Sequence, residues 1–521
     1  MEEGSAIKDC TTSYRGSAIA MIYEPWSNYS TGAITFTMKG ATISGCSTTG
    51  SANYAQGGAI FTSGRVTMDI QDSTIENNTA NGNGGAIYGA STNYSGDIVL
   101  NLSGTTITGN TSQQLGGGVY FNGTTFTVSG VTNITGNTGK GSSNNVYLAA
   151  GKTVSGSGLQ EGSQVGISGA NIPPPWSPAM PTTAKPAISP PTAPTPSSRP
   201  PMALLSWWAR RTTPTASAAA PNCDGTPEGH RMITCKGVSS LDLIKDSGSY
   251  YLLNDVTLTK TWKPNGGTLC LNGHAIHAAW KTAAIELENT YITFNLTDCG
   301  TDGKVTGNIN NSGGVDEASG VIIGTRATFN LYNGSICDNT LYSYQTGLKA
   351  GAVEANGTFN MYGGSIKNNQ GTGWIGVDSN YIGGVLVSST GKFNLYDGEL
   401  SGNRSAHDER ASGTFNGGAV YVNGGKFTMT GGVIKNNRAG GGNVLGDGGA
   451  VYVNGGKFTM TGGEISGNTV SRNGGGVAVV KGTFEMTGDA KISGNKAQMD
   501  YRHYEHKGGG VLCGRPAAPS P

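Results

Sequence analysis

The chain has 521 residues and a formal net charge of +1, and 86 of its residues are glycine. This glycine content is more than twice the usual share of about 7% and argues against a helix-rich fold. Charged residues make up only 13% of the chain, so no strong field gathers nucleic acid or anionic lipid. No apolar run reaches the roughly 20 residues of a membrane span, and the opening MEEGSAIKDC has no signal-peptide pattern. We expect neither a nucleic-acid partner nor membrane insertion.

Residues 1–170 carry an internal repeat of short apolar runs. Gly-Gly pairs open the runs GGAIF, GGAIYG and GGGVYF, and an alternating run, an isolated Ile and in most units an Asn follow. The repeated positions are Phe36, Met68, Leu100 and Phe126, then Ile43, Ile75, Ile107 and Ile134, then Asn78, Asn110 and Asn137. Alternation with period two predicts strands, and a fixed order of strands at a near-constant period indicates a solenoid. The segment starts within the pattern, so we expect it to lack an N-terminal cap.

Residues 171–222 break this pattern. They hold 14 of the 20 prolines and no glycine, aspartate or glutamate. One interpretation is an irregular Pro/Ala/Thr/Ser-rich linker, extended as polyproline II. The other is a reading-frame slip in the gene, which the run ALLSWWARR favours because paired tryptophans are unusual in a solvated stalk.

Residues 223–262 differ from both the repeats and the linker. The pattern predicts a short amphipathic turn near Ser240–Ile244, followed by strands at Tyr250–Leu253 and Val256–Leu258. We interpret this region as the cap that begins the second repetitive segment.

Residues 263–513 return to the repeat. The sixteen residues GGAVYVNGGKFTMTGG occur at Gly417–Gly432 and again at Gly448–Gly463. The recurring positions are Phe329, Phe359, Phe393, Phe427 and Phe458, then Ile336, Ile366, Leu400, Ile434 and Ile465, then Asn339, Asn369, Asn403, Asn437 and Asn468. Phe484 begins one more unit, whose Ile492 and Asn495 come one residue late. We expect the tail, residues 514–521, to be disordered.

These coils must stack on one another to be stable. About five inward side chains per coil contribute roughly 7–15 kcal/mol, whereas ordering some thirty backbones costs about 1–2 kcal/mol each. Stacking adds hydrogen bonds between coils and closes the core above and below. The sequence therefore predicts an all-β fold, a parallel β-helix with three short strands per coil, built as two segments that the Pro-rich residues join. Uncapped coils would also allow edge-to-edge self-association.

The recurrent Asn has two interpretations. Asn tolerates a left-handed backbone at the corner after the third strand, and amides in successive coils can hydrogen-bond as a ladder. Alternatively, the row is a polar binding surface. The structural interpretation is the simpler one.

The chain resembles right-handed parallel β-helix proteins of the pectin-lyase-like superfamily, and especially repetitive surface proteins of gut Gram-positive bacteria. The likeness rests on FNMYGGSIKNN (359–369), FTMTGGEISGN (458–468), LCLNGHAI (269–276) and NLTDCGTDGKVTGN (295–308). The resemblance implies an extracellular or cell-surface structural or adhesive module that contacts glycans or host or bacterial surface components. The sequence shows no sorting motif or wall-binding repeat for attachment.

The cysteines do not form a metal-binding pattern. Eight are scattered without CxxC spacing, so a zinc site is not expected. Cys270 and Cys299 lie about one coil apart and would be neighbours in the stack, which allows a disulfide in an oxidising compartment. The alternative is that the cysteines are ordinary small side chains in the stack.

Candidate catalytic groups do not cluster in the sequence. Asp298 and Asp302 share a turn, while Asp316-Glu317 and His407–Arg410 lie in loops. His274 and His277 match no metal motif, because two ligands without a third bind weakly. We predict no catalytic residue, cofactor or metal ion.

A row of tyrosines is the most distinctive predicted surface feature. Tyr332, Tyr362 and Tyr396 should stack at one-coil intervals on the outside, flanked by the amides of Asn330, Asn360 and Asn394. Aromatic faces beside amides could hold sugar rings, whereas stacked tyrosines also simply stabilise neighbouring strands. Tyr88, Tyr120, Tyr421 and Tyr452 form a similar outward set, which favours the packing interpretation.

Two functions remain. A non-catalytic surface rod explains the near-identical repeats, and a polysaccharide lyase or glycoside hydrolase explains the fold. An active site needs one coil to differ, and Asp298–Asp316 is the candidate stretch for it. The near-identical copies favour the rod.

Overall fold

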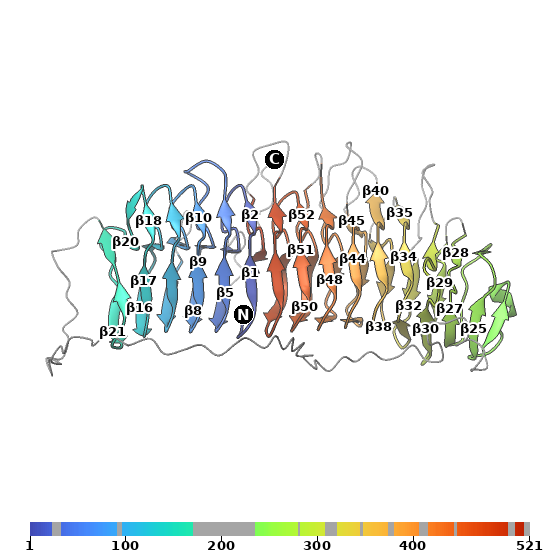
Figure 1. Ribbon diagram of the computed structural model, residues 1–521. Coiled ribbons are helices and arrows are strands. Elements are labelled where there is room, and N and C mark those ends of the chain that lie inside the picture. Colours follow the sequence, from blue (N-terminus) through green and yellow to red (C-terminus); the bar gives the residue numbers. More distant parts are fainter. Residues whose placement is uncertain are drawn as a thin grey trace, which may run out of the picture.

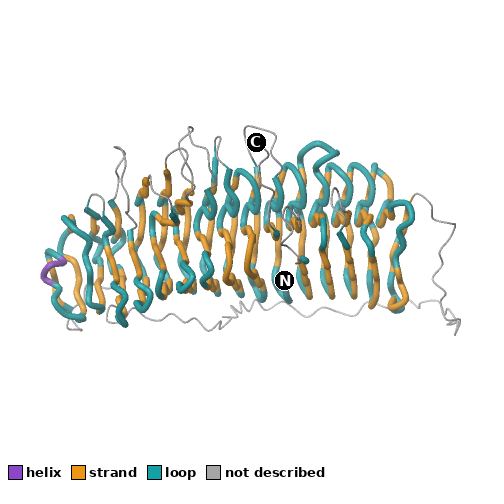
Figure 2. The backbone as a smooth tube through the Cα atoms, turned by 180° about the vertical axis from the view of Figure 1, so that it is seen from behind, coloured by secondary structure: helices purple, strands orange, loops and turns teal. Residues whose placement is uncertain are grey.

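The computed structural model shows one elongated parallel β-helix (Figure 1). It describes residues 1–22, 33–90, 96–169, 235–279, 282–307, 320–343, 347–373, 380–405, 415–441, 445–498 and 506–514. The Pro-rich residues 171–222, the first part of the expected cap and residues 515–521 of the tail lie outside this description. Figure 2 shows a single row of stacked coils from the opposite side.

Each typical coil contains the three expected strands and a short fourth one. In one coil these are β46 (Val420–Val422), β47 (Lys426–Met429), β48 (Val433–Lys435) and β49 (Arg438–Ala439). In two later coils the first and second strands merge into β50 (Val451–Met460) and β53 (Val477–Met486). The two-residue fourth strand was not predicted, because two residues are too short to show an alternating pattern.

The third strands form one sheet that runs the length of the rod. In spatial order its fifteen members are β22 (Gln164–Val165), β17 (Asn133–Thr135), β13 (Thr106–Thr108), β9 (Thr74–Glu76), β5 (Thr42–Ser44), β1 (Ala6–Lys8), β54 (Lys491–Ser493), β51 (Glu464–Ser466), β48, β44 (Glu399–Ser401), β39 (Ser365–Lys367), β34 (Ser335–Cys337), β31 (Lys304–Thr306), β28 (Ala275–His277) and β26 (Val256–Thr257). All its pairings are parallel, with the recurrent Ile or Leu in register wherever the repeat is regular, as at Ile434 and Ile465.

The two repetitive segments stack on each other in an order that differs from the chain order. β1 near the start of the chain pairs with β54 near its end, Ala6 opposite Lys491 and Lys8 opposite Ser493. The fourth strands β2 (Thr11–Thr12) and β55 (Lys496–Ala497) pair in the same way, as do the first strands β3 (Ile19–Ile22) and β56 (Val511–Cys513). The rod therefore runs through residues 235–513 and continues into residues 1–169, and the two segments cover each other's open edges.

The core is a set of vertical columns of identical side chains. Phe427 is 1% exposed, and its ring stacks 4.8 Å from Phe393 and 4.5 Å from Phe458, centroid to centroid. Ile434 and Met429 are fully buried beside it. Sheet ladders place equivalent residues about 4.8 Å apart, which is why one repeated sequence produces continuous columns.

The recurrent Asn side chains point inward and form the predicted ladder. Asn437 is fully buried; its Nδ2 donates to Asn468 Oδ1 at 3.0 Å, and its Oδ1 accepts from Asn403 Nδ2 at 3.0 Å. The left-handed backbone lies one residue earlier than we expected, at Asn436 (φ 55°) rather than at Asn437. The turn residue can therefore be solvated while the next amide enters the core.

The Gly-Gly pairs have two separate physical causes. Gly448 has φ +68°, a left-handed conformation that glycine adopts at no steric cost. Gly449 has an ordinary φ, but a Cβ on it would lie 2.2 Å from the carbonyl oxygen of Gly475 in the next coil. The first glycine turns the chain, and the second allows the coils to approach each other.

The cap lies at one end of the rod. It contains β24 (Lys236–Val238), the 3-10 helix η1 (Leu241–Leu243) and β25 (Ser249–Leu252), followed by β26. Ser240 caps η1 through its side chain, which accepts from the amide of Asp242. Leu241 and Leu252 are buried against the first coils, so this end of the core is shielded from solvent.

A buried histidine at the joint between the segments predicts acid sensitivity. His506 is 5% exposed, and its backbone oxygen accepts from Thr12 Oγ1 at 3.1 Å and from the Arg15 amide at 3.1 Å. Burial lowers the pKa of His506, an effect that two backbone hydrogen bonds oppose only in part. Because the unfolded chain binds a proton near pH 6.5 and the folded chain does so only at lower pH, stability should fall as the pH drops below about 6.5, by at most about 1.4 kcal/mol per pH unit.

The measurement is the midpoint of thermal unfolding, followed by circular dichroism between pH 7.5 and 5. We expect His506→Gln to flatten the pH dependence. His274→Gln is the control, since His274 lies outside the core beside Asp255 at 3.3 Å. If the unfolding midpoint depends equally on pH in His506→Gln and in the unsubstituted chain, His506 is not the source of the acid sensitivity.

Candidate functional site

The predicted tyrosine row exists on the outside of the rod. Tyr332 and Tyr362 stack with their ring centroids 5.0 Å apart, and Tyr362 and Tyr396 stack at 4.8 Å with an interplanar angle of 4°. They follow the second strands β33 (Thr328–Leu331), β38 (Thr358–Met361) and β43 (Lys392–Leu395), which pair in register. Partial burial raises the pKa of Tyr332 and Tyr362, so these phenols are neutral at physiological pH.

The three predicted amides form a second ladder beside the tyrosines. Asn330 donates through Nδ2 to Asn295 Oδ1, Asn360 to Asn330, and Asn394 to Asn360, each at 2.8 Å. Asn330 is 8% exposed, and the other two candidate amides are half-buried. The structure thus brings all six predicted residues together in two parallel rows.

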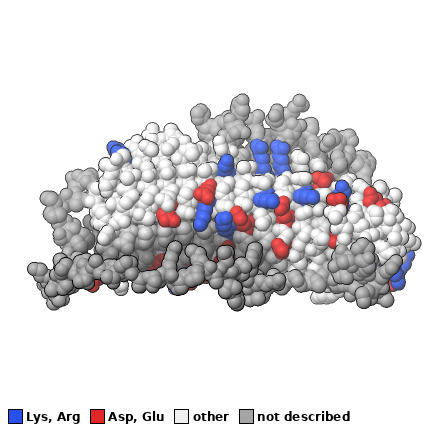
Figure 3. Space-filling model, in the orientation of Figure 1, with Lys and Arg blue, Asp and Glu red and all other residues white. Residues whose placement is uncertain are grey.

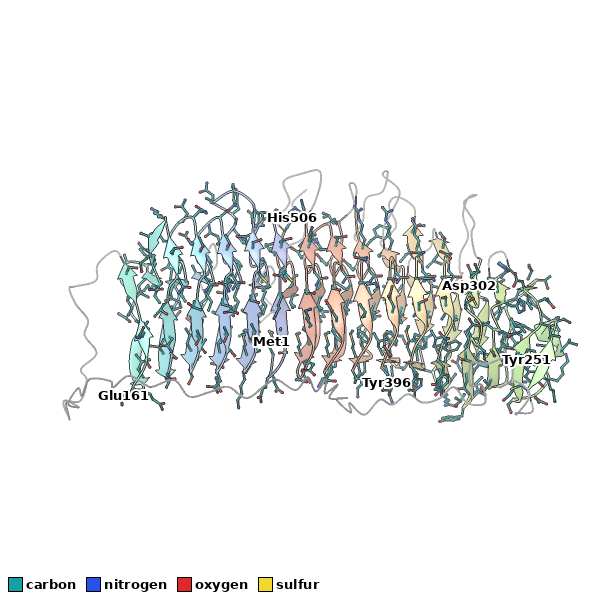
Figure 4. All side chains as sticks on the ribbon, in the orientation of Figure 1. Met1, Glu161, Tyr251, Asp302, Tyr396 and His506 are labelled. Carbon is teal, nitrogen blue, oxygen red and sulfur yellow. The ribbon has the colours of Figure 1, made fainter. Side chains whose placement is uncertain are left out.

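Most of this surface is already occupied by internal contacts. Both faces of the Tyr362 ring lie against neighbouring tyrosines, so a sugar cannot stack there. The row ends at Tyr396, which is 36% exposed and has an aromatic neighbour on one face. The next strand has Thr428 in place of the amide. Among the described residues, Asn394 Oδ1 accepts no hydrogen bond. Thr430 takes the equivalent position in the coil after Tyr396, so the end of the two rows presents a partly exposed ring without a second aromatic neighbour, and one amide oxygen. Figure 4 shows Tyr396 at the outer edge of the rod.

A hollow of about 450 Å³ lies on the third sheet beside the tyrosine row. Its lining includes Asp298, Ser335, Lys367 and Glu399. The Asp298 carboxylate accepts from the backbone amides of Gly273 (2.7 Å), Gly300 (3.1 Å) and Gly303 (2.9 Å). Asp298 is 5% exposed, so these amides hold the carboxylate in a structural role at the corner.

The remaining carboxylate of the hollow is also paired. Glu399 Oε2 lies 2.8 Å from Lys435 Nζ. Burial alone would raise the pKa of Glu399, but Lys435 and the Ser401 hydroxyl outweigh it and hold that pKa below its usual value. Glycoside hydrolysis generally needs two carboxyl groups with different protonation states, and this hollow does not present two free ones. Of the other loop carboxylates that we considered, Asp302 is exposed, whereas Asp316-Glu317 and His407–Arg410 lie outside the described residues.

Charged side chains concentrate on the third-sheet face of residues 330–500 (Figure 3). Glu399 pairs with Lys435 at 2.8 Å, and Glu464 pairs with Lys491 at 3.6 Å, each between adjacent coils. These side chains are roughly 35–46% exposed, so each pair contributes little stability in water. The ion pairs largely neutralise this face.

Two arginines stand side by side on the fourth sheet. Arg404 and Arg438 are direct partners in the pairing of β45 (Arg404–Ser405) with β49. Partial burial and the neighbouring Arg438 lower the pKa of Arg404, as expected where two cations repel each other. The described residues contain no salt bridge to either guanidinium, so this is a local cationic patch.

The predicted cysteine neighbours are close together. Cys270 Sγ lies 2.7 Å from Cys299 Sγ. Cys270 is nevertheless a free thiol, and Cys299 is disulfide-bonded, so a disulfide between these two residues is not formed. Burial raises the pKa of Cys270 to about 11, which keeps it protonated and unreactive.

The described residues contain no group of three His, Cys, Asp or Glu side chains that could hold a metal ion. No helix in this part of the chain has the length and apolarity needed to cross a bilayer. Comparison with protein-family models, curated proteins and solved structures finds no match to this chain.

Proposed function

We propose that this protein is a non-catalytic β-helical rod at a bacterial surface, with a structural or adhesive role and a weak glycan-binding surface. The extracellular location and the kinship with pectin-lyase-like surface proteins belong to this proposal and rest on the resemblance of the repeats. The observation that supports it best is the uniformity of the outside, where amides, tyrosines and ion pairs recur from coil to coil. A catalytic site would require one coil to differ, and the hollow beside the tyrosine row has both of its carboxylates engaged.

The glycan contact would lie at the end of the tyrosine row. A sugar ring can pack against the exposed part of the Tyr396 ring while one of its hydroxyls donates to Asn394 Oδ1. Aromatic faces combine apolar area with low side-chain entropy, which suits them to such contacts. The cost of opening this site is small, because no existing stack must be broken.

The test incubates the full chain with a panel of plant and mucin polysaccharides and measures both retention and product release. We expect retention without new reducing or unsaturated ends. For a retained glycan, Tyr396→Ala should weaken binding at least roughly tenfold, about 1.4 kcal/mol. Tyr147→Ala is the matched control, since Tyr147 ends another aromatic stack, 5.5 Å from Tyr120.

Three outcomes would count against the proposal. New chain ends would show a polysaccharide lyase or hydrolase. Absence of retention for every glycan would contradict the adhesive role. Equal losses of glycan affinity in Tyr396→Ala and Tyr147→Ala would contradict the location of the site at Tyr396.

A further inference from the structure

The joint between the two segments is an interface between distant parts of the chain. The Ala6 amide donates to Ala490 O at 3.1 Å, the Thr11 amide to Asn495 O at 3.0 Å, and the Val511 amide to Ala18 O at 2.7 Å. These bonds are the same in kind as those between coils of one segment. Figure 4 places Met1 and His506 where the first coils of the chain meet the last.

The joint is also less continuous than the steps on either side of it. The inner Asn ladder ends at Asn495, and Cys10 and Cys46 take the place of the amide in the next two coils before Asn78 resumes it. Their sulfurs donate to backbone oxygens of their own coils, at 3.3 and 3.4 Å, and the two thiols also contact each other. The second-strand sheet is interrupted as well, since β4 (Ile34–Lys39) ends a five-stranded sheet and does not pair with β53.

The covalent connection does not determine which copies meet at the joint. Residues 170–234 leave the first segment at the outer end that contains β22 and reach the second segment at the cap. Fifteen third strands at about 4.8 Å per step span about 67 Å. Sixty-five residues reach at most roughly 215–234 Å, far more than this span, and effective concentration falls as such a connection lengthens.

We propose that this joint is also a docking surface for a second copy of the chain. The strands β1, β2 and β3 of one copy stack on β54, β55 and β56 of another, in the register that they adopt within one molecule. If two copies exchange their segments reciprocally, they form a closed dimer. If each copy pairs with a different neighbour at its two edges, the copies form head-to-tail chains of rods. A second copy of the chain is the expected partner, because its strand edges are the same edges that already pair across the joint within one molecule.

The experiment uses two full-length copies with different affinity tags, co-expressed in one cell. One carries Lys8→Cys and the other Ser493→Cys, two partly exposed positions that are direct strand partners across the joint. After mild oxidation, purification through both tags should recover a mixed disulfide dimer on a non-reducing gel. Adjacent strands lie about 4.8 Å apart, within the Cα separation that a disulfide requires.

The control pairs Ser493→Cys with Ser44→Cys, whose position is one strand beyond Lys8 and therefore about 9.6 Å from Ser493. We expect at least a fivefold larger yield of mixed disulfide from the in-register pair. If either variant fails to fold, judged by circular dichroism, Ala6→Cys with Lys491→Cys replaces the pair. Equal yields in the in-register pair and the control would overturn the proposal, as would the absence of any disulfide between copies that carry different tags.

Discussion

Replacing Asn437 with alanine should destabilise the rod by about 3–6 kcal/mol. The buried Asn437 side chain accepts from the Asn403 amide at 2.9 Å and donates to Leu400 O at 2.9 Å, besides its bonds to the neighbouring ladder amides. Alanine would leave two or three of these groups buried without partners, and each such group costs about 1–3 kcal/mol. The measurement is the free energy of unfolding from a denaturant titration followed by circular dichroism.

The matched control is Asn394→Ala in the outer ladder. Asn394 is half-buried and donates one side-chain bond, to Asn360 Oδ1. Water can replace that bond, so its loss should cost about 0.5–1.5 kcal/mol. Similar costs at the two positions would show that the inner ladder is not the main polar support of the core. A large loss of glycan retention with unchanged stability in Asn437→Ala would instead support the binding interpretation of this row.

Replacing Gly449 with alanine should cost about 3 kcal/mol or more. The new Cβ would lie 2.2 Å from Gly475 O and 2.7 Å from Thr469 O. Both atoms belong to the backbone of an adjacent coil, so no flexible side chain can move aside. Overpacking of a close-packed interior typically costs about 1–3 kcal/mol, and here the shift would also disturb the hydrogen bonds on both sides of the coil. The same unfolding titration gives the value.

Gly151→Ala separates backbone conformation from crowding. Gly151 has φ +74°, and an added Cβ would meet no atom within 4 Å. Its replacement should cost only the strain of a left-handed alanine, about 1–2 kcal/mol. A Gly449→Ala variant no less stable than Gly151→Ala would mean that close approach of the coils does not explain the second glycine of the motif.

The sequence predicted the columns because each repeated position has one physical environment. Phe427 and Phe458 recur at the same offset in two coils, and the structure buries both rings in one stack, 4.5 Å apart. The offset of the Asn from the preceding Phe predicted the ladder of amides. The tyrosine and Asn rows were predicted in the same way, since residues at equal offsets lie on top of one another.

Other features have no signature in the local pattern. The chain order of the two segments gives no information about which edges meet, so the pairing of β1 with β54 required the structure. Asp298 was considered as a candidate acid, and its three backbone donors depend on the path of neighbouring coils. The left-handed conformation was expected at Asn437 and lies at Asn436. Propensity alone does not determine which of two adjacent Asn residues turns the chain.

The most direct test of the account measures the distance between spin labels at Ser401 and Thr108 by pulsed electron paramagnetic resonance. These residues end β44 and β13, which lie seven strand steps apart in the shared sheet although the Pro-rich linker and the first coils of the second segment lie between them in the chain. At about 4.8 Å per step, the monomeric protein, diluted with unlabelled chain, should give a narrow distribution near 34 Å. A broad distribution, or one centred beyond about 60 Å, would contradict a single continuous rod.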